Sequence, residues 1–357
     1  MDFGIALATP ADSWRVVKRA EELGFSHAWF YDTQMLSGDC FVAMGAAAVH
    51  TSKIRLGTGV LIPSNRIAPV TANAFATLNQ LAPGRIDFGV GTGFTGRRAM
   101  GFGAMKLADM AEYIRVTMGL LDEQTVEAQF EGSQSRIRFL NPDAGCINTQ
   151  DPVGLHISAY GPRGRSLTAD LGASWITFTG DVATANAHLS EMQQTWAHAG
   201  RPKQDLYATH FALGCVLEEG EPADSERAMR QAGPRATVQL HRAVDEALMG
   251  LPNAGKLPDE LQDLCDRYVQ AAAQFEPQEK DRHLVTHRGH LMFVRPEERP
   301  FVTAELIRHT SWTGTQAELI AQIGDLRDAG YRQFTIQLVP GAEDALEDWA
   351  RIKAAFE

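Results

Sequence analysis

The feature of this sequence that most limits its fold is a regular alternation of short, β-rich apolar runs with amphipathic helical segments. Eight runs have the composition of strands: residues 3–8, 26–31, 54–62, 85–90, 155–159, 175–178, 206–216 and 333–339. Most are followed by a helical pattern, and near-continuous apolar strands joined through helices predict a parallel sheet covered by helices. Eight units favour a closed (β/α)8 barrel of the TIM type over an open doubly wound sheet, which more often has about five to seven strands.

Three expected helix-to-strand junctions share a glycine, at Gly24, Gly172 and Gly330. Glycine just past the end of a helix takes the left-handed conformation and lets the chain turn directly into a strand. The repeated junction supports one barrel domain across all 357 residues, a length that α/β barrels commonly reach.

Composition excludes several classes of function. The 33 Lys+Arg against 44 Asp+Glu give a net charge of −11, which disfavours a broad nucleic-acid or anionic-membrane surface. No apolar run approaches the ~18 residues of a membrane span, and the first residues lack the basic region of a signal peptide. The four cysteines lie at least 50 residues apart, so we predict neither a zinc ribbon nor a disulfide scaffold and expect a cytoplasmic location.

Two segments interrupt the alternation. Residues 126–152 are rich in turn formers and are expected to form a hairpin. Residues 218–313 lie between the seventh and eighth strands, where prolines such as Pro234 and Pro258 are expected to separate helices. An insertion after a barrel strand lies over the C-terminal face, where active sites are built, so we interpret this one as a helical lid within the single domain.

Glycine-rich strand ends indicate a ligand close to the backbone. Residues 91–96 read Gly-Thr-Gly-Phe-Thr-Gly directly after the fourth strand, and Gly57 and Gly59 lie within the third. A dinucleotide fingerprint should open the first βα unit and precede an acidic residue on the next strand, and this GxGxxG does neither. Because glycine inside a strand marks a bulge or a close ligand, the two strand ends together predict a site for a planar ligand.

The end of the fifth strand carries an anion-binding pattern. Tyr160, Gly161, Pro162 and Arg163 open a helix, which leaves backbone N–H groups and the positive end of the helix dipole free for an anion. Arg163 or Arg165 adds a guanidinium suited to phosphate. Thr179-Gly180, after the sixth strand, is expected to complete the cradle; the alternative is ordinary capping with surface arginines.

Three histidines of the insertion, His283, His287 and His290, have spacings of four and three that suit one helical face. Arg288-Gly289 interrupts the segment, however, and no HExxH motif or supporting carboxylate spacing accompanies it. We therefore predict no metal site. Substrate-facing histidines on a mobile lid and plain solvent contact are the interpretations left open.

Taken in order, these strings resemble the bacterial luciferase-like flavin-dependent oxidoreductases over nearly the whole chain. The matching pieces are residues 22–25 with 28–32, 54–60, 76–85 with 88–93, 158–162, 312–315 and 326–330. The Gly161-Pro162 pair and residues 287–290 are most similar to the branch that contains deazaflavin-dependent methylene-tetrahydromethanopterin reductases.

The resemblance implies FMN or a deazaflavin coenzyme at the C-terminal mouth of the barrel, with its ring against the third-strand bulge and its phosphate near the fifth and sixth strand ends. The implied coenzyme-binding residues are Gly57, Thr58, Gly59, Val60, Gly91, Thr92, Tyr160, Gly161, Pro162, Arg163, Thr179 and Gly180. Many members carry a histidine just after the second strand, where this chain has Asp32-Thr33-Gln34. The candidates for proton transfer are therefore Asp32, His210, His287 and His290.

Three functions remain open. The favoured one is a monooxygenase that uses reduced FMN and dioxygen on a small organic substrate, with a flavin reductase supplying the reduced FMN. The second is a reductase or dehydrogenase that transfers hydride with an 8-hydroxy-5-deazaflavin coenzyme. The third is a non-catalytic flavin-binding protein, against which the long insertion argues. A homodimer or higher homo-oligomer is expected, and the substrate is not readable from the sequence.

Overall fold

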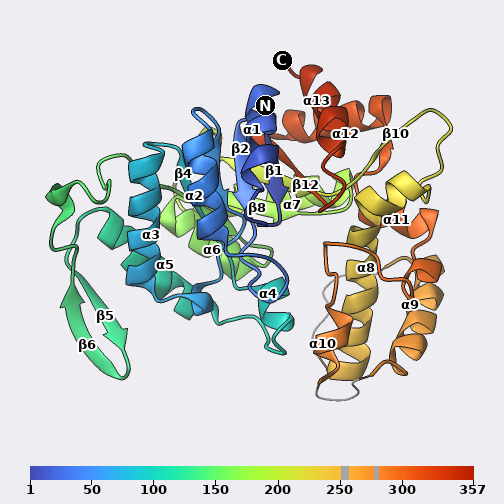
Figure 1. The fold of residues 1–357 in the computed structure, drawn as a ribbon, viewed down its shortest axis with the longest axis horizontal. Helices are drawn as coiled ribbons and strands as arrows, with labels where there is room; N and C mark the ends of the chain where they lie inside the picture. Colours follow the sequence, from blue (N-terminus) through green and yellow to red (C-terminus); the bar gives the residue numbers. More distant parts are fainter. Residues whose placement is uncertain (251–256, 277–280) are drawn as a thin grey trace.

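A computed structural model describes residues 1–250, 257–276 and 281–357 of the chain. Its centre is a closed barrel of eight parallel strands in the order β1-β12-β9-β8-β7-β4-β3-β2 (Figure 1). The strands are β1 (Asp2–Leu7), β2 (His27–Phe30), β3 (Arg55–Thr58), β4 (Ile86–Val90), β7 (Gly154–Ser158), β8 (Ser174–Phe178), β9 (Ala208–Ala212) and β12 (Gln333–Leu338). Each of the eight predicted runs overlaps one of them, with boundaries that differ by a few residues, so the (β/α)8 prediction is confirmed.

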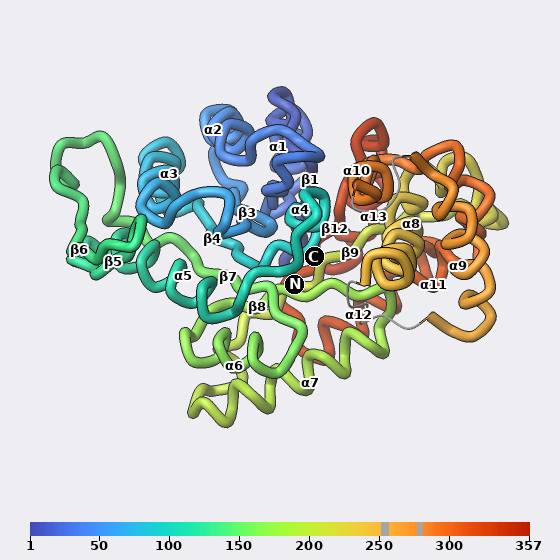
Figure 2. Tube along the Cα trace, turned by 90° about the horizontal axis from the view of Figure 1, so that it is seen from below, coloured from blue at the N-terminus to red at the C-terminus, as the bar shows by residue number. Residues whose placement is uncertain are grey.

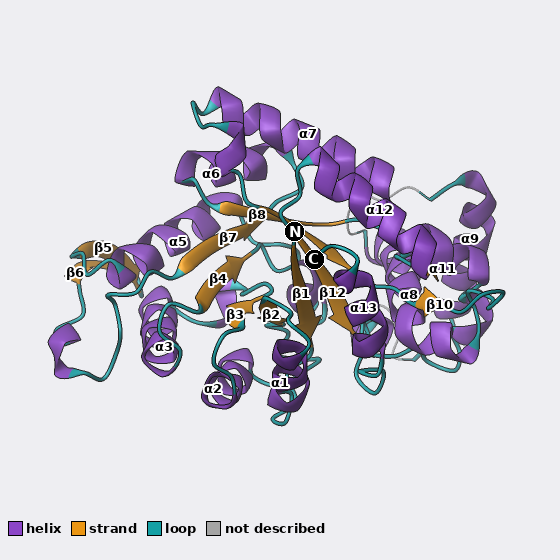
Figure 3. Ribbon diagram, turned by 90° about the horizontal axis from the view of Figure 1, so that it is seen from above, coloured by secondary structure: helices purple, strands orange, loops and turns teal. Residues whose placement is uncertain are grey.

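Helices surround the barrel on its outside (Figure 3). They are α1 (Trp14–Glu22), α2 (Cys40–His50), α3 (Ala68–Leu81), α5 (Leu107–Leu121), α6 (Pro162–Leu171), α7 (Val182–His198), α12 (Gln316–Ala329) and α13 (Ala345–Ala354). Gly24, Gly172 and Gly330 end α1, α6 and α12 with positive φ angles, as the shared junction predicted. Within the described residues, no helix is both long and apolar enough to cross a membrane.

The alternation of side chains along each strand separates two cores. Phe30 of β2 packs under the surrounding helices, whereas its neighbours Trp29 and Tyr31 belong to a cluster inside the barrel with Ile176 and Phe211. In the pairing of β2 with β3, Trp29 lies opposite Gly57. The barrel interior is therefore filled by aromatic side chains, as expected of a packed barrel rather than a pore.

Two short segments outside the barrel follow β4 along the chain, a hairpin and a short helix. β5 (Val126–Phe130) and β6 (Ser133–Ile137) form the predicted antiparallel hairpin, which projects from one side of the molecule (Figure 1). The short helix α4 (Phe94–Arg98) follows β4. Seen from below, it lies over the end of the barrel, with the insertion to one side of it (Figure 2).

The insertion forms a helical unit with its own core between the seventh and eighth barrel strands. It consists of α8 (Glu226–Met249), α9 (Asp259–Ala272), α10 (His283–Thr286) and α11 (Ala304–Thr310). Two short parallel strands, β10 (Val216–Leu217) and β11 (Gly314–Thr315), pair at its base. An insertion thus lies between the seventh and eighth barrel strands as predicted, and its helices fall within residues 218–313.

One expectation for the insertion is wrong. Pro234 lies inside α8 and does not separate two helices. A proline within a helix removes a backbone hydrogen bond, but α8 is buried on most of its circumference along this stretch, and packing holds it together across the proline.

Candidate functional site

The parallel barrel places the segments that follow its strands at one end, which we call the carboxyl end. The insertion reaches this end at two points. Met292 packs against the interior cluster that contains Tyr31 and Phe211, and His290 Nε2 lies 3.5 Å from Thr95 Oγ1 of α4. Residues from the barrel loops and the insertion therefore meet at the end where barrel enzymes bind their ligands.

An apolar surface caps the barrel interior at the carboxyl end. Val60, Phe178 and Met292 are partly buried and pack on the interior cluster. Val60 follows β3, Phe178 ends β8, and Met292 comes from the insertion. Partly exposed apolar side chains above a filled core are a suitable support for a planar ring.

Helix α8 presents two unlike faces. One carries an apolar stripe that packs with α9 and α11, formed by Met229, Ala232, Ala236, Leu240 and Val244. The other carries Gln231, Arg235 and Arg242, whose spacing of four and seven residues keeps them on one side of the helix. The guanidinium of Arg235 lies 4.4 Å from the centre of the Phe178 ring, so this polar face is directed at the carboxyl end of the barrel.

The charged groups on the polar face of α8 have no ion-pair partner among the described residues, although Arg242 lies 5.0 Å from the centre of the Phe94 ring, as Arg235 lies over Phe178. Arg235 and Arg242 form no ion pair with any residue the structure describes, and the Nε atom of each is buried without a hydrogen bond. Both amide atoms of Gln231 are also buried and unpaired. Burial, and then the charge of Arg242, lower the pKa of Arg235 to about 9, so it stays protonated at neutral pH. Buried charge without a partner is costly, and an anionic ligand would supply the missing one.

Sequence reasoning missed these arginines. The signal that could have found them is the occurrence of Gln231, Arg235 and Arg242 at helical spacing opposite a continuous apolar stripe. A helix with only one buried face would leave such residues in solvent. Only the three-dimensional packing shows that both faces of α8 are covered.

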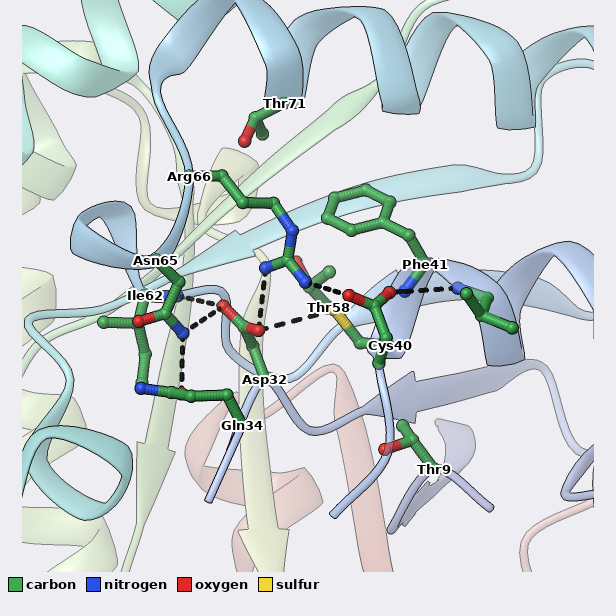
Figure 4. A network of polar contacts seen from close by, with 12 residues as sticks. Thr9, Asp32, Gln34, Cys40, Phe41, Thr58, Ile62, Asn65, Arg66 and Thr71 are labelled. Carbon is green, nitrogen blue, oxygen red and sulfur yellow. Dashed lines mark hydrogen bonds and ion pairs between the residues drawn. The ribbon is translucent and has the colours of Figure 1, made fainter. Parts of the chain in front are cut away.

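Asp32 lies directly after β2, and both of its carboxylate oxygens are engaged (Figure 4). Oδ2 accepts hydrogen bonds from the Ile62 backbone N–H and from Asn65 Nδ2, each at 3.0 Å. Oδ1 accepts from Arg66 Nη1 at 2.8 Å and from the Cys40 thiol at 3.7 Å. This buried carboxylate anchors the segment that follows β3, and these contacts favour a positioning role over proton transfer.

The histidine predicted on the seventh strand does not face the site. His210 is fully buried, stacks on Phe334 with ring centroids 5.8 Å apart, and packs edge-on against Trp312. These partners belong to the layer between strands and helices. Burial lowers the pKa of His210 to about 3, with a smaller effect from His188. Because strand side chains alternate, it is Phe211 that points into the barrel, and the packing of His210 does not support the acid–base role predicted for it.

The sixth strand end differs from the expected phosphate cradle. Thr179 Oγ1 lies 2.9 Å from His210 Nε2, so its hydroxyl points into the packing layer. A Cβ on Gly180 would stand 2.9 Å from the backbone of Thr310 at the end of α11. Glycine is required there for close packing of the insertion, so the open cradle expected at Thr179-Gly180 is not present.

The fifth strand end keeps its predicted character. Gly161 is the N-cap of α6, with Pro162 at the first helical position and no side chain capping the free N–H groups. Arg163 is exposed, whereas Arg165 is buried and pairs with Glu191 at 2.7 Å. No described atom lies within 4 Å of the position that a Cβ on Gly161 would take. The turn is therefore open to a ligand, and Arg163 is its available cation.

The third-strand glycines serve the barrel core. A Cβ on Gly57 would lie 2.6 Å from the Trp29 ring, and one on Gly59 would lie 2.7 Å from Trp29 Cβ. The contacts therefore do not support the interpretation that Gly57 marks the close approach of a ligand, because the Trp29 indole already occupies that space. Thr58 donates to the Gly89 carbonyl at 2.7 Å within the wall. Of this group, Val60 alone is on the apolar surface at the carboxyl end.

The fourth strand end is close to the third. A Cβ on Gly91 would stand 2.8 Å from Val60 Cγ2, so glycine lets the two strand ends approach. The Thr92 carbonyl accepts a hydrogen bond from the Met105 N–H at 3.0 Å. Tyr160, which follows the neighbouring strand β7, is about half exposed. The remaining predicted binding residues thus border the same end of the barrel.

His287 and His290 are buried, so solvent contact is excluded for both. His287 Nε2 lies 3.1 Å from Asp245 Oδ1, and His290 Nδ1 lies 3.1 Å from His241 Nδ1. The other ring nitrogen of His290 approaches Thr95. The insertion thus gathers histidines beside α4, with His241 of α8 as a member that sequence spacing did not indicate.

Comparison with known proteins decides the family. The sequence profile of the luciferase-like monooxygenases matches residues 4–333. The chain belongs to this family. An F420-dependent glucose-6-phosphate dehydrogenase of Nakamurella multipartita is 28% identical over 264 residues, covering 71% of this chain and 75% of that enzyme. One of Beutenbergia cavernae is 34% identical over 145 residues, or 38% of this chain, and the match spans only 41% of that enzyme's length.

Solved structures agree with the fold. The F420-dependent tetrahydromethanopterin reductase from Methanopyrus kandleri superposes with a TM-score of 0.70 at 18% identity, covering 100% of this chain and 99% of that one. Family membership and these relatives place the chain among the oxidoreductases. The resemblance inferred from the sequence is therefore confirmed.

Proposed function

We propose that this protein is a deazaflavin-dependent oxidoreductase that transfers hydride between its coenzyme and a small anionic substrate. The observation that carries the substrate class is the polar face of α8, where Arg235 is buried, Arg242 is partly buried, and neither has an ion-pair partner among the described residues. The coenzyme class is supported by the F420-dependent relatives. This reverses the order of the two expectations from the sequence, in which the FMN monooxygenase came first.

The residues at the carboxyl end fit such a coenzyme. The half-buried apolar group of Val60, Phe178 and Met292 would support the ring. The open turn at Gly161, with Arg163 beside it, would take the phosphate at the N-terminus of α6. When bound, a deazaflavin supplies a hydride donor or acceptor and no dioxygen chemistry.

The remaining side chains orient the substrate and exclude water. Arg235 stacks on Phe178, so an anion on its guanidinium would lie next to the surface proposed for the ring. Thr95 and His290 stand at the border of this region and are candidates to exchange a proton with the substrate. We propose that the insertion, from which Arg235 and His290 come, closes the site, as expected of a lid.

The test is a direct comparison of coenzymes. We expect fluorescence titration to give an affinity for oxidised F420 at least about tenfold higher than for FMN, a difference of about 1.4 kcal/mol. Under anaerobic conditions, glucose 6-phosphate is a fitting first substrate, because the relatives are named for it. Loss of F420 absorbance on its addition, or on addition of another anionic sugar or acid, would support the proposal.

The other functions give different results. Tighter binding of FMN, with oxygen uptake that depends on a substrate and on a flavin reductase, would replace the proposal with the monooxygenase. Binding of a coenzyme without turnover on any substrate tried would favour the non-catalytic flavin protein.

A further inference from the structure

The insertion contains a compact cluster of three histidines from two separate segments. His241 comes from α8, and His287 and His290 from the segment around α10. Each offers one ring nitrogen, and the three nitrogens lie within 4.8 Å of one another. The ring centroids are 5.3–5.8 Å apart in every pair, so no ring is peripheral.

The spacing suits a metal ion. Zinc binds histidine nitrogen at about 2.0–2.1 Å, which puts two ligands of a tetrahedron about 3.3 Å apart. His241 Nδ1 and His290 Nδ1 are 3.1 Å apart. Three histidines with one open position are a known zinc ligand set.

Carboxylates orient two of the rings from behind. His241 Nε2 lies 2.6 Å from Glu298 Oε1, and His287 Nε2 lies 3.1 Å from Asp245 Oδ1. Metal-bound histidines almost always direct the second ring nitrogen to such an acceptor, which fixes the tautomer and leaves the first nitrogen free for the metal. Here that leaves His241 Nδ1 and His287 Nδ1 as the two free ligand atoms.

One of these two nitrogens, His287 Nδ1, has no hydrogen-bond partner among the described residues. This atom is buried, in a side chain that is 3% exposed. A network of hydrogen bonds accounts for the short contact between His241 and His290 but leaves this nitrogen unpaired. A metal ion satisfies all three ligands at once.

We propose that His241, His287 and His290 bind a divalent transition-metal ion, with zinc the best match to three neutral imidazoles. Asp245 pairs with Arg98, and Glu298 with Arg295, so the two carboxylates are already neutralised. The charges of Arg242 and Arg235 act on His290 and would favour an anionic group in the fourth position. The site adjoins the proposed substrate region through Thr95, and a metal ion on His290 Nδ1 would leave Nε2–H as a hydrogen-bond donor to Thr95 in place of the proton exchange proposed for His290. Coenzyme binding and hydride transfer do not depend on this metal site.

The experiment measures metal directly in the tag-free, full-length protein. Elemental analysis is expected to find about one zinc per chain, and the metal-stripped protein is expected to bind Co²⁺ with the visible absorption of tetrahedral coordination. His287→Gln should abolish both signals. His283→Gln, at the start of α10 and outside the cluster, is the matched control and should keep them.

A second variant protects the test from misfolding. Glu298→Gln keeps all three ligands and should weaken zinc binding by about 10- to 100-fold, as loss of a supporting carboxylate does. Absence of bound zinc and of any Co²⁺ spectrum in the folded wild-type protein would overturn the proposal. So would equal metal binding by His287→Gln and the wild type.

Discussion

Charged side chains are paired within the chain at one end of the barrel and lack an ion-pair partner among the described residues at the other. At the amino end, Asp87 pairs with Arg55 at 2.7 Å and lies 3.5 Å from His156. At the carboxyl end, Arg235 and Arg242 have no such partner among the described residues. Asp87 and Arg235 are both buried, so burial of a charged side chain does not by itself identify a ligand-binding site. A charge paired within the chain stabilises the fold, whereas an unpaired one is a candidate for ligand binding.

Electrostatics at the amino end agree with a structural role. Burial alone would raise the pKa of Asp87, but the hydrogen bond with His156 and the ion pair with Arg55 hold it well below its ordinary value. Burial lowers the pKa of His27 to about 4 despite the nearby Asp87. Asp87 is therefore an ionised aspartate held by partners within the chain.

The largest expected change in stability comes from removing the Asp87 carboxylate at the amino end of the barrel. Asp87→Asn leaves Arg55 and His156 without their carboxylate, and we expect the free energy of unfolding to fall by about 3–5 kcal/mol. Urea unfolding followed by circular dichroism measures it. Glu112→Gln, which breaks an exposed pair with Arg115, is the control and should change it by less than about 1 kcal/mol. Weakened coenzyme binding by a stable Asp87→Asn protein would contradict the comparison.

Substitution of Arg235 at the carboxyl end should affect ligand binding and not lower stability. Arg235→Met removes a buried charge without a partner, so stability should be unchanged or higher. Binding of an anionic substrate should weaken by about 10- to 150-fold, the value of one hydrogen bond to a charged group. The measurement is the KM for the substrate found in the coenzyme assay, with coenzyme affinity as the internal control. A destabilised variant with an unchanged KM would show that Arg235 belongs to the structure.

A third prediction concerns acid sensitivity. Folding lowers the pKa of His210 from its ordinary 6.5 to about 3, so the unfolded chain binds more protons between these limits. Stability contributed by neutral His210 is complete above pH 6.5 and declines as the pH falls, by about 2 kcal/mol between pH 6.5 and 5. His210→Gln should flatten the pH dependence of unfolding in that window. An unchanged profile would place the acid sensitivity elsewhere, with His27 the next candidate.

The smallest effect distinguishes two glycines of the carboxyl end. Gly180→Ala forces a methyl group against the backbone of Thr310 and should cost about 1–3 kcal/mol of stability. Gly161→Ala meets no described atom within 4 Å and should change stability by less than about 0.5 kcal/mol. Its effect should instead be weaker binding of the phosphate-bearing coenzyme. Equal stability losses would contradict an open turn at α6, and Arg163→Gln provides an independent check on coenzyme affinity.

Local patterns in the sequence were sufficient for the scaffold. Each barrel strand follows from its own apolar run, and Gly24, Gly172 and Gly330 end their helices because of a conformation that glycine adopts by itself. The start of α6 at Gly161-Pro162 and the capping box of Thr315 with Glu318 are equally local. The family was readable for the same reason, since its motifs are short strings at strand ends.

Only the tertiary structure decided which residues belong to the site. The side of β9 on which His210 lies depends on strand register, and the use of Gly57 depends on the indole of Trp29 from a neighbouring strand. His241 joins His287 across 46 residues, and both faces of α8 are buried only because barrel and insertion close around it. Spacing along the chain cannot encode such contacts, because packing between distant segments sets them.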